Sequence, residues 1–417
     1  MAASDRRNSL VVGSEPFVRL MLTLGVAALF ALALLVNYHL AHNLGAFSDL
    51  LGRLANLQHL ERTGNIYLPP TKEAFTYPPA AILFFWPLLW LPAPLLTLAC
   101  TFASLVALAV ALGVVLERLW PRDRRITFAI ACWAAVVATV VFAPVLECLT
   151  WGQVGTVLLA MVVVDYLAVK GRSRGVMVGV AAAVKIYPIL FIVVWIVRRQ
   201  WRAAITALVS CASTTALAWS LWPASAMTFI TRGIIGGTEV GHARSGTAPV
   251  ASSSISALFT RFPFHAGTLN DAGVAAVSLV VIVAGLVAAR RLWRRDLEVS
   301  AMVVIMVVSV IGSPIAWDHY FVFAPLLALM AYELGFASRL SRTAVASAVV
   351  MVVPWFRFRR LAWGPWWVPA CSFVARNALL LAALSVVVAA LTDAHLDQVP
   401  HYEQWLRDSS DVPSSLS

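Results

Sequence analysis

An acidic residue, Asp49, lies in the first polar stretch of the chain that could carry chemistry. Apolar residues recur around it at helical spacing: Phe47, Leu50, Leu51, Leu54, Leu57 and Leu60. With Ser48 as a candidate N-cap, this pattern predicts an amphipathic helix that lies on a membrane surface. A carboxylate in its first turn could accept a proton from a bound hydroxyl group. The alternative is that Asp49 only stabilises the helix N-terminus.

A cation in an apolar segment is the second candidate. Lys185 lies in the middle of AAAVKIYPIL, close to Tyr187. Placing such a charge at the centre of a bilayer costs about 3 kcal/mol on insertion scales, so it should face a polar partner or a cavity. Either Lys185 lines a site and binds an anion there, or its ammonium group reaches a membrane face from a half-helix.

Two further pairs of polar residues lie at predicted helix boundaries. Glu147 and Gln153 flank a short loop in PVLECLTWGQVGT, where they either contact a ligand or help to start a helix. Asp318 and His319 lie in SPIAWDHYF, next to aromatic residues that are typical of a membrane interface. A substrate contact and a structural role both remain open for these residues.

A basic cluster, FRFRR, contains Arg359 and Arg360 and precedes several tryptophans. It could bind an anionic headgroup or a lipid-linked phosphate, or it could only anchor the chain at the interface. No phosphate-cradling loop, no His/Cys metal cluster and no Asp-x-Asp pair occurs in the sequence. We therefore expect neither a cofactor nor a metal ion, and no nucleotide-dependent chemistry at the cytoplasmic side.

The composition indicates a polytopic membrane protein, because 61% of the residues are hydrophobic and only 12% are charged. Apolar stretches recur from Phe17 to Leu391, many of them near the ~20 residues that cross a bilayer as a helix. They show no period-two alternation, so helices are favoured over a β-barrel. The net charge of +11 comes from short basic clusters between these stretches, which membrane topology explains better than nucleic-acid binding.

Placing the basic clusters in the cytoplasm predicts the topology of an all-α membrane domain over residues 1–392. The predicted spans are residues 17–38, 94–117, 127–146, 152–169, 203–222, 272–289, 297–314, 320–336, 343–356 and 369–391. Two long external loops, 39–77 and 223–271, should contribute to a site, and residues 393–417 form a cytoplasmic tail. Segments 78–92 and 175–197 contain internal prolines and are expected to be broken or re-entrant. The expected total is ten to thirteen transmembrane or re-entrant helices.

Several motifs occur together in a recognisable order. They are Asp49, the pair Gly64 and Tyr67, FTYPPAAILFFWPLLWLP from Phe75 to Pro92, WGQVGTVLLA from Trp151 to Ala160, GVAAAVKIYPILFI from Gly179 to Ile192, and SPIAWDHYF from Ser313 to Phe321. This succession resembles the bacterial membrane mannosyltransferases that use polyprenyl-phosphate-mannose, glycosyltransferase family 87, which have the GT-C fold. The central loop differs: where members often have Asn-Gln-Ser before a helix, this chain reads APVASSSISALFTRF.

The resemblance implies an inverting enzyme at the external face of a plasma membrane. It would move mannose onto a mannosylated lipid, such as a phosphatidylinositol mannoside, or a lipomannan-type lipoglycan, and form an α-(1→2) link. Asp49 would be the general base. The other residues that the resemblance assigns to substrate binding are His319, Lys185, Tyr187, Gln153, Asp318, Tyr77, Arg359 and Arg360. Among these, Lys185 and the two arginines would meet the phosphate of the donor.

Two alternatives remain. One is a polyprenyl-phosphate-arabinose-dependent transferase with the same fold, and the other is a transporter or flippase for a lipid-linked sugar. The broken helices and Lys185 suit an enzyme and a transporter equally well. The predicted surface helix with Asp49 favours the enzyme, because a transporter has no need of such a helix.

Overall fold

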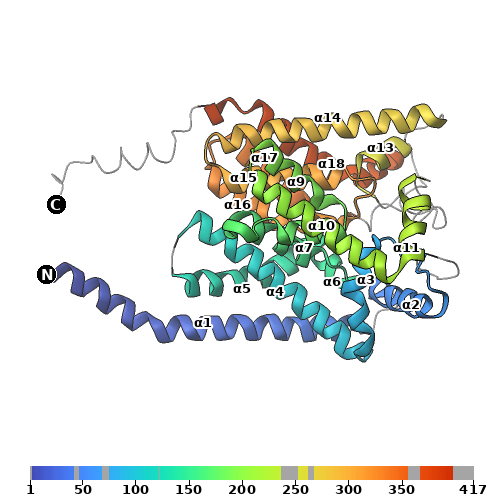
Figure 1. Cartoon of the computed structure of the whole chain (residues 1–417). Helices are drawn as coiled ribbons and strands as arrows, with labels where there is room; N and C mark the ends of the chain where they lie inside the picture. The colour runs from blue at the N-terminus through green and yellow to red at the C-terminus, as the bar shows by residue number, and fades with distance from the viewer. Residues whose placement is uncertain are drawn as a thin grey trace. The chain divides into compact units, whose positions relative to one another are not determined.

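The computed structural model describes residues 2–41, 47–67, 75–121, 123–235, 252–261, 267–355 and 367–397. Over these ranges the regular elements are helical, apart from one isolated bridge between Ser252 and Trp317. Six of the described helices are long and apolar enough to cross a membrane, or up to seven if a bent pair counts as one span. The chain is therefore an all-α, multi-pass membrane protein, as predicted. Figure 1 shows these helices, coloured from blue at the N-terminus to red at the C-terminus. The chain divides into two compact units, Met1–Ala248 and Pro249–Ser417.

Three long helices form one side of the first unit. They are α1 (Ala2–Ala41), α4 (Ala93–Leu119) and α5 (Arg124–Val141), and each packs against the other two. Gly25 allows α1 to approach α5 closely, because a Cβ at this position would lie 2.9 Å from the Cβ of Cys132. With 27 residues, α4 is about 40 Å long, enough to cross a bilayer.

Two shorter helices follow α5 and meet at a sharp turn. Helix α6 (Ala143–Thr150) and helix α7 (Gly155–Val163), which continues as a π-helix to Ala168, are bent by 120°. This corrects two predicted spans: the segment predicted at 127–146 ends as α5 at Val141, and the one at 152–169 begins only after the turn. The break places the residues of the turn, Trp151 to Val154, between two helix ends.

The first unit is completed by broken helices. Helix α8 (Val176–Val184) stops at Lys185 and is followed by the 3₁₀ helix Tyr187–Ile189 and by α9 (Leu190–Val197), as the proline there predicts. Helices α10 (Trp201–Leu221) and α11 (Pro223–Thr228) follow. The Pro-rich segment is likewise not one helix but three short ones: Pro79–Ala81, α3 (Ile82–Phe85) and Trp86–Trp90.

The helix predicted around Asp49 is present as α2 (Ser48–Thr63). Its N-cap position is Phe47 with a φ of 56°, so Ser48 is the first helical residue and not the cap. It ends at Gly64, whose φ of 73° suits glycine. Its buried face holds three of the predicted apolar residues together with Arg53 and Asn56. The orientation of α2 toward a membrane surface stays a prediction.

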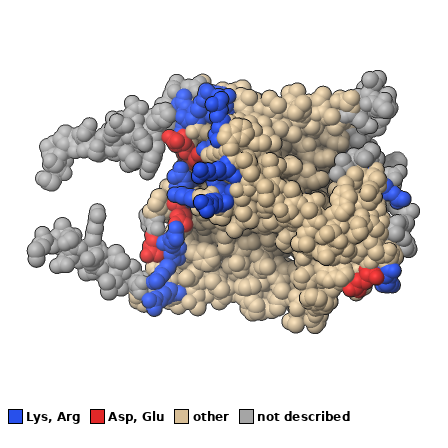
Figure 2. All heavy atoms as spheres, viewed as in Figure 1, with Lys and Arg blue, Asp and Glu red and all other residues tan. Residues whose placement is uncertain are grey.

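Helix α2 lies at one end of α4. It packs against α3 and the 3₁₀ helix that follows it, and Leu96 near the start of α4 joins Phe47 and Leu50 in one apolar cluster. Arg118 lies near the other end of α4, close to the start of α5. On the face shown in Figure 2, charged side chains of the first unit gather where α4 joins α5 and again near α2, with an uncharged surface between them.

The second unit is also helical where it is described. Its elements are α13 (Ile255–Thr260), α14 (Gly267–Trp293), α15 (Glu298–Ile311), the 3₁₀ helix Asp318–Phe321, α16 (Ala324–Leu334), α17 (Arg339–Val350) and α18 (Trp367–Thr392). The spans predicted at 297–314, 320–336 and 343–356 correspond to helices of 14, 11 and 12 residues. These are too short for a straight crossing of ~20 residues, so the total of ten to thirteen transmembrane or re-entrant helices stays a prediction.

Candidate active site

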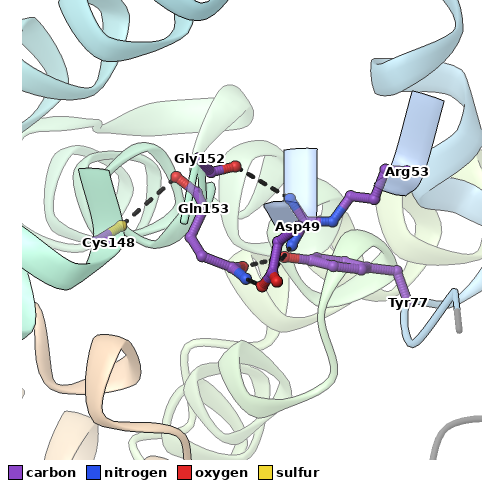
Figure 3. A network of polar contacts seen from close by, with 6 residues as sticks. All are labelled: Asp49, Arg53, Tyr77, Cys148, Gly152 and Gln153. Carbon is purple, nitrogen blue, oxygen red and sulfur yellow. Dashed lines mark hydrogen bonds and ion pairs between the residues drawn. The ribbon is translucent and has the colours of Figure 1, made fainter. Parts of the chain in front are cut away.

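A chain of side-chain hydrogen bonds ends on Asp49 (Figure 3). The Gln153 Nε2 group donates to Asp49 Oδ2. The Tyr77 hydroxyl donates in turn to Gln153 Oε1 at 2.7 Å. These three residues come from α2, from the start of the Pro-rich segment and from the turn between α6 and α7. The fold therefore joins three of the sequence motifs at one carboxylate.

Arg53 holds the same carboxylate from the opposite side. Its Nη2 lies 3.5 Å from Asp49 Oδ2, and its Nη1 donates to the Gly152 carbonyl oxygen at 3.0 Å. The guanidinium carbon lies 4.8 Å from the centroid of the Tyr77 ring, within the range of a cation–π contact. The Arg53 side chain is only 7% exposed, whereas that of Asp49 is 33% exposed. The cation is thus buried behind an acid that stays accessible.

The α6–α7 turn fits closely against the first turn of α2. The Phe47 N–H donates to the Thr150 carbonyl at 2.8 Å. Gly152 has a φ of 63°, and a Cβ there would lie 2.6 Å from the Cβ of Leu50. The Gln153 N–H donates to the Cys148 carbonyl at 2.8 Å, which fixes the backbone of the turn. A glycine is therefore required at residue 152 for Gln153 to reach Asp49.

Lys185 lies near the same tyrosine. Its Nζ is 5.3 Å from the centroid of the Tyr77 ring and 5.8 Å from that of Tyr187, and the residue is buried. Arg53 and Lys185 thus both contact the ring of Tyr77. Burial raises the pKa of the Tyr77 phenol to about 12, with Arg53 opposing and Asp49 adding to this shift. The phenol stays protonated at physiological pH and can act as a hydrogen-bond donor.

The first loop is tethered to α11 by its Asn-Ile-Tyr segment. The Ile66 N–H donates to Ser225 Oγ at 3.0 Å, and Asn65 Nδ2 donates to Thr228 Oγ1 at 2.7 Å. The Tyr67 hydroxyl donates to the Tyr77 carbonyl oxygen at 2.6 Å. These bonds position the backbone of Tyr77 and give Tyr67 a structural role.

The other predicted residues lie in the second unit. Asp318 and His319 are both buried at the start of a 3₁₀ helix. Asp318 Oδ1 accepts a hydrogen bond from Ser253 Oγ at 3.2 Å, and the His319 ring packs edge-on against Tyr320 at 5.1 Å. Ser254, from the serine run in the central loop, caps α13 by accepting from the Ala257 N–H at 3.1 Å.

The predicted site residues fall into three groups by where they lie in the structure. Asp49, Gln153 and Tyr77 are joined directly, and Lys185 lies beside the Tyr77 ring, with Tyr187 next to it. Asp318 and His319 belong to the second unit. Arg359 and Arg360 lie outside the described residues.

The sequence interpretation missed Arg53. The signal was present, because Arg53 interrupts the apolar stripe three residues after Leu50 and four before Leu57, and it follows Asp49 by one helical turn. A charged residue on the buried face of a helix needs a partner.

The arrangement suits proton transfer to the carboxylate of Asp49. Over the described part of the chain, no three His, Cys, Asp or Glu residues lie close enough to hold a metal ion. Within that same part, both contacts of the Asp49 carboxylate fall on Oδ2. Oδ1 is therefore the oxygen that can accept a proton from a bound molecule.

Comparisons with known proteins agree with the motifs. The model for glycosyltransferase family 87 matches residues 75–314, a segment that contains Tyr77, Gln153 and Lys185 and begins after Asp49. No solved structure matches the chain.

Three mycobacterial proteins are similar to most of the chain. A polyprenol-phosphate-mannose-dependent alpha-(1-2)-phosphatidylinositol mannoside mannosyltransferase of Mycobacterium tuberculosis is 30% identical over 66% of this chain and 67% of its own length. The protein of the same name from Mycolicibacterium smegmatis is 31% identical, and 62% of each chain is matched. A Mycobacterium tuberculosis enzyme named for phosphatidylinositol pentamannoside is 26% identical over 74% of this chain and 70% of its own length. This chain thus spans roughly two thirds of the length of these relatives.

Proposed function

Because the chain belongs to glycosyltransferase family 87, we propose that it transfers mannose from polyprenyl-phosphate-mannose to a mannosylated phosphatidylinositol or a related lipoglycan. The mycobacterial relatives are named for this donor, for phosphatidylinositol mannoside acceptors and for α-(1→2) linkage. The linkage and the class of acceptor are carried over from these names. The bundle would be of the GT-C type.

The observation that carries the proposal is the partly exposed carboxylate of Asp49. Among the described residues, its contacts are with Gln153 and Arg53, and both are made through Oδ2. A base must be deprotonated and within hydrogen-bond reach of the hydroxyl group that it activates. The Nη2 group of the neighbouring Arg53 lies 3.5 Å from Asp49 Oδ2. Oδ1 is then directed to the substrate side while Oδ2 is restrained. This matches the role of a general base.

The proposed reaction is a single displacement with inversion. A hydroxyl oxygen of the acceptor attacks the anomeric carbon of the donor mannose, and its proton passes to Asp49 Oδ1. The bond between that carbon and the phosphate oxygen breaks on the opposite face, and polyprenyl phosphate leaves with the electron pair. A β-linked donor therefore gives an α-linked product. General-base assistance of this kind typically contributes about 10²–10⁴-fold to the rate.

Lys185 is the described cation that best suits the departing phosphate, because the two Nη groups of Arg53 already contact Asp49 and Gly152. Lys185 is buried at the Tyr77 ring, and a buried cation stabilises a developing negative charge more strongly than an exposed one. Arg359 and Arg360 remain candidates for the same role from the sequence. In the second unit, His319 and Asp318 are proposed to contact the sugar of the donor or of the acceptor, and Tyr187 would line the donor side.

We place the site at the external face of the plasma membrane. Arg118, Arg124 and Arg125 lie at the end of α4 away from α2, and basic clusters of this kind favour the cytoplasm. Because α4 is long enough to cross the bilayer, α2 and Asp49 would lie at the opposite surface. An amphipathic α2 in the membrane interface would bring the base close to the headgroups of lipid substrates.

The test is a transfer assay with purified protein. Polyprenyl-phosphate-mannose with a radiolabelled sugar is supplied together with a phosphatidylinositol mannoside, and label in the acceptor is measured. Wild type should transfer label, and Asp49→Asn should lower kcat by about 10²–10⁴-fold. Glu61→Gln is the matched control, since Glu61 is an exposed acid on the same helix and should be dispensable.

Each contrary outcome has a defined meaning. Transfer that survives Asp49→Asn would remove Asp49 as the base. Transfer only from polyprenyl-phosphate-arabinose would change the donor. If no sugar reaches any glycolipid acceptor, but labelled donor crosses the bilayer of reconstituted vesicles, the chain is a flippase and the enzyme proposal is wrong.

A further inference from the structure

The direction of the hydrogen bonds in the chain that ends on Asp49 follows from which groups have a proton to donate. An ionised carboxylate has no proton to donate, so the Gln153 side chain must turn its NH₂ group toward Asp49 Oδ2. Its Oε1 then faces Tyr77, and only a donor can satisfy it there. Burial raises the pKa of the Tyr77 phenol to about 12, which keeps the required proton on that oxygen. The chain therefore runs in one direction, from Tyr77 through Gln153 to Asp49.

The backbone of the turn leaves Gln153 little freedom. Its N–H is bonded to the Cys148 carbonyl, and its own carbonyl accepts from Cys148 Sγ at 3.5 Å. The preceding carbonyl, that of Gly152, is held by Arg53. Because its backbone is fixed, the Gln153 side chain can define the position of Asp49. A residue that supports an active-site group must have this property.

Burial separates these two residues from the acid that they support. Gln153 and Tyr77 are 6% and 3% exposed, whereas the Asp49 side chain is 33% exposed. The polar ends of Gln153 and Tyr77 are bonded to each other and to Asp49, not turned toward an open surface (Figure 3). This differs from the sequence-based expectation that both residues contact the substrate.

We propose that Gln153 and Tyr77 are positioning residues that fix the rotamer of Asp49, so that Oδ2 is held and Oδ1 accepts the proton of the acceptor hydroxyl. This inference rests on the proposed function, in which Asp49 is the base. It assigns the substrate contacts to other groups. A displacement of about 1 Å at a reacting group can cost about 10²-fold in rate, so the support matters although it never touches the sugar.

Kinetic constants distinguish positioning from substrate binding. Gln153→Met keeps the length of the side chain and removes the donor to Asp49. It should lower kcat by about 10- to 100-fold and leave the KM values for donor and acceptor within about two-fold. Tyr77→Phe removes only the hydroxyl group and should lower kcat by about five-fold, the effect of one ordinary hydrogen bond. A residue that binds substrate would instead raise a KM.

A pH profile supplies a readout that a merely structural role would not change. Gln153→Glu is nearly isosteric and places a second carboxylate against Asp49. Two adjoining carboxylates share a proton, so the acidic limb of kcat/KM should move to higher pH by about one unit or more. The other titratable groups near this pair are Arg53 on α2, Lys185 at the break after α8, Tyr77 in the first loop and Cys148 on α6. These four groups are the same in the wild type and in Gln153→Glu.

The matched control is Gln58→Glu, the same chemical change on an exposed position of α2. It should leave the profile unchanged, and equal thermal unfolding of all variants would show that each one is folded. The inference is overturned if Gln153→Met raises a KM without lowering kcat, or if Gln153→Glu has the wild-type acidic limb, while Asp49→Asn is inactive. If Asp49→Asn retains transfer, the base assignment itself fails, which is a separate result.

Discussion

Arg53 lies one helical turn after Asp49 on α2, with its Nη2 3.5 Å from Asp49 Oδ2 and its Nη1 3.0 Å from the Gly152 carbonyl oxygen. One guanidinium group thus connects the acid to the turn that carries Gln153. Because the Arg53 side chain is buried, the ion pair is less screened by solvent than a surface pair. The position of the acid and the position of the turn therefore depend on the same guanidinium group.

The first prediction concerns this double contact. In Arg53→Lys the positive charge is kept, but a single ammonium group cannot reproduce the planar fork that bridges Asp49 and Gly152. We expect kcat to fall by about ten-fold, which corresponds to about 1.4 kcal/mol, a typical value for a hydrogen bond to a charged group. Steady-state transfer with saturating donor measures this change.

The control for this substitution lies on the same helix. Arg62 is exposed, and Arg62→Lys should not change kcat. Equal activity of the Arg53→Lys and wild-type proteins would mean that charge alone matters at this position and that the bridge to Gly152 is dispensable.

The second prediction concerns Gly152. In Gly152→Ala the new Cβ would lie 2.6 Å from the Cβ of Leu50, and the residue would keep a φ of 63°. The turn must move away from α2, so transfer should fall by about 10²-fold or more as Gln153 withdraws from Asp49. Kinetics and thermal unfolding in detergent measure the two consequences.

A second glycine separates the steric effect from backbone strain. Gly171 also has a positive φ, 76°, but a Cβ there would meet nothing within 4 Å. Gly171→Ala should therefore show the modest destabilisation of a left-handed alanine, about 1 kcal/mol, with normal activity. If both variants lose activity equally, close packing against α2 is not the reason that residue 152 is glycine.

Local features of the fold could be predicted from the sequence because they depend on nearby residues. The helix after Phe47 follows from its apolar spacing, and the break at Lys185 follows from Pro188. Helices α15, α16 and α17 are shorter than the spans predicted for them, because hydropathy reports apolar length and not where a helix ends. A short loop was predicted between the spans at 127–146 and 152–169, but its bounds were wrong: Gly152 was assigned to the start of a span, although its positive φ belongs to the turn between α6 and α7.

The site was predicted in part. Residue type and location identified Asp49 and Gln153 as candidates, and the family resemblance added Tyr77, but neither indicated that they bond to one another across 76 and 104 residues of sequence. Such contacts depend on tertiary packing, which a single sequence does not encode in any local pattern. Arg53 was overlooked because an arginine on a predicted surface helix is usually solvated, although its place in the apolar stripe indicated the burial that the structure shows.

The third prediction tests the topology. Glu61 is exposed on α2, and Arg124 is exposed at the start of α5. In intact cells, a membrane-impermeant thiol reagent should label Glu61→Cys, whereas Arg124→Cys should be labelled only after permeabilisation. Both substitutions are made in a Cys371→Ser background, because Cys371 is the exposed native cysteine in the described part of the chain. Labelling of residue 124 from outside, with residue 61 protected, would place Asp49 in the cytoplasm and contradict the proposed site.

The last prediction concerns the phosphate of the donor. Lys185 is buried with its Nζ at the rings of Tyr77 and Tyr187, so its charge is held close to the base and not at a membrane face. Lys185→Met keeps most of the side-chain volume and removes the charge. The KM for polyprenyl-phosphate-mannose should rise by about ten-fold, as expected for the loss of one charge-assisted contact, while the acceptor KM stays unchanged.

Product inhibition makes this test specific, because polyprenyl phosphate carries the phosphate without the sugar. Its inhibition constant should rise in parallel with the donor KM in Lys185→Met and stay the same in Lys170→Met, where an exposed lysine is lost. If the inhibition constant of Lys185→Met equals that of wild type, the ammonium group does not bind the phosphate. Its position against two aromatic rings would then stabilise only the break between α8 and α9, and another cation would have to bind the phosphate.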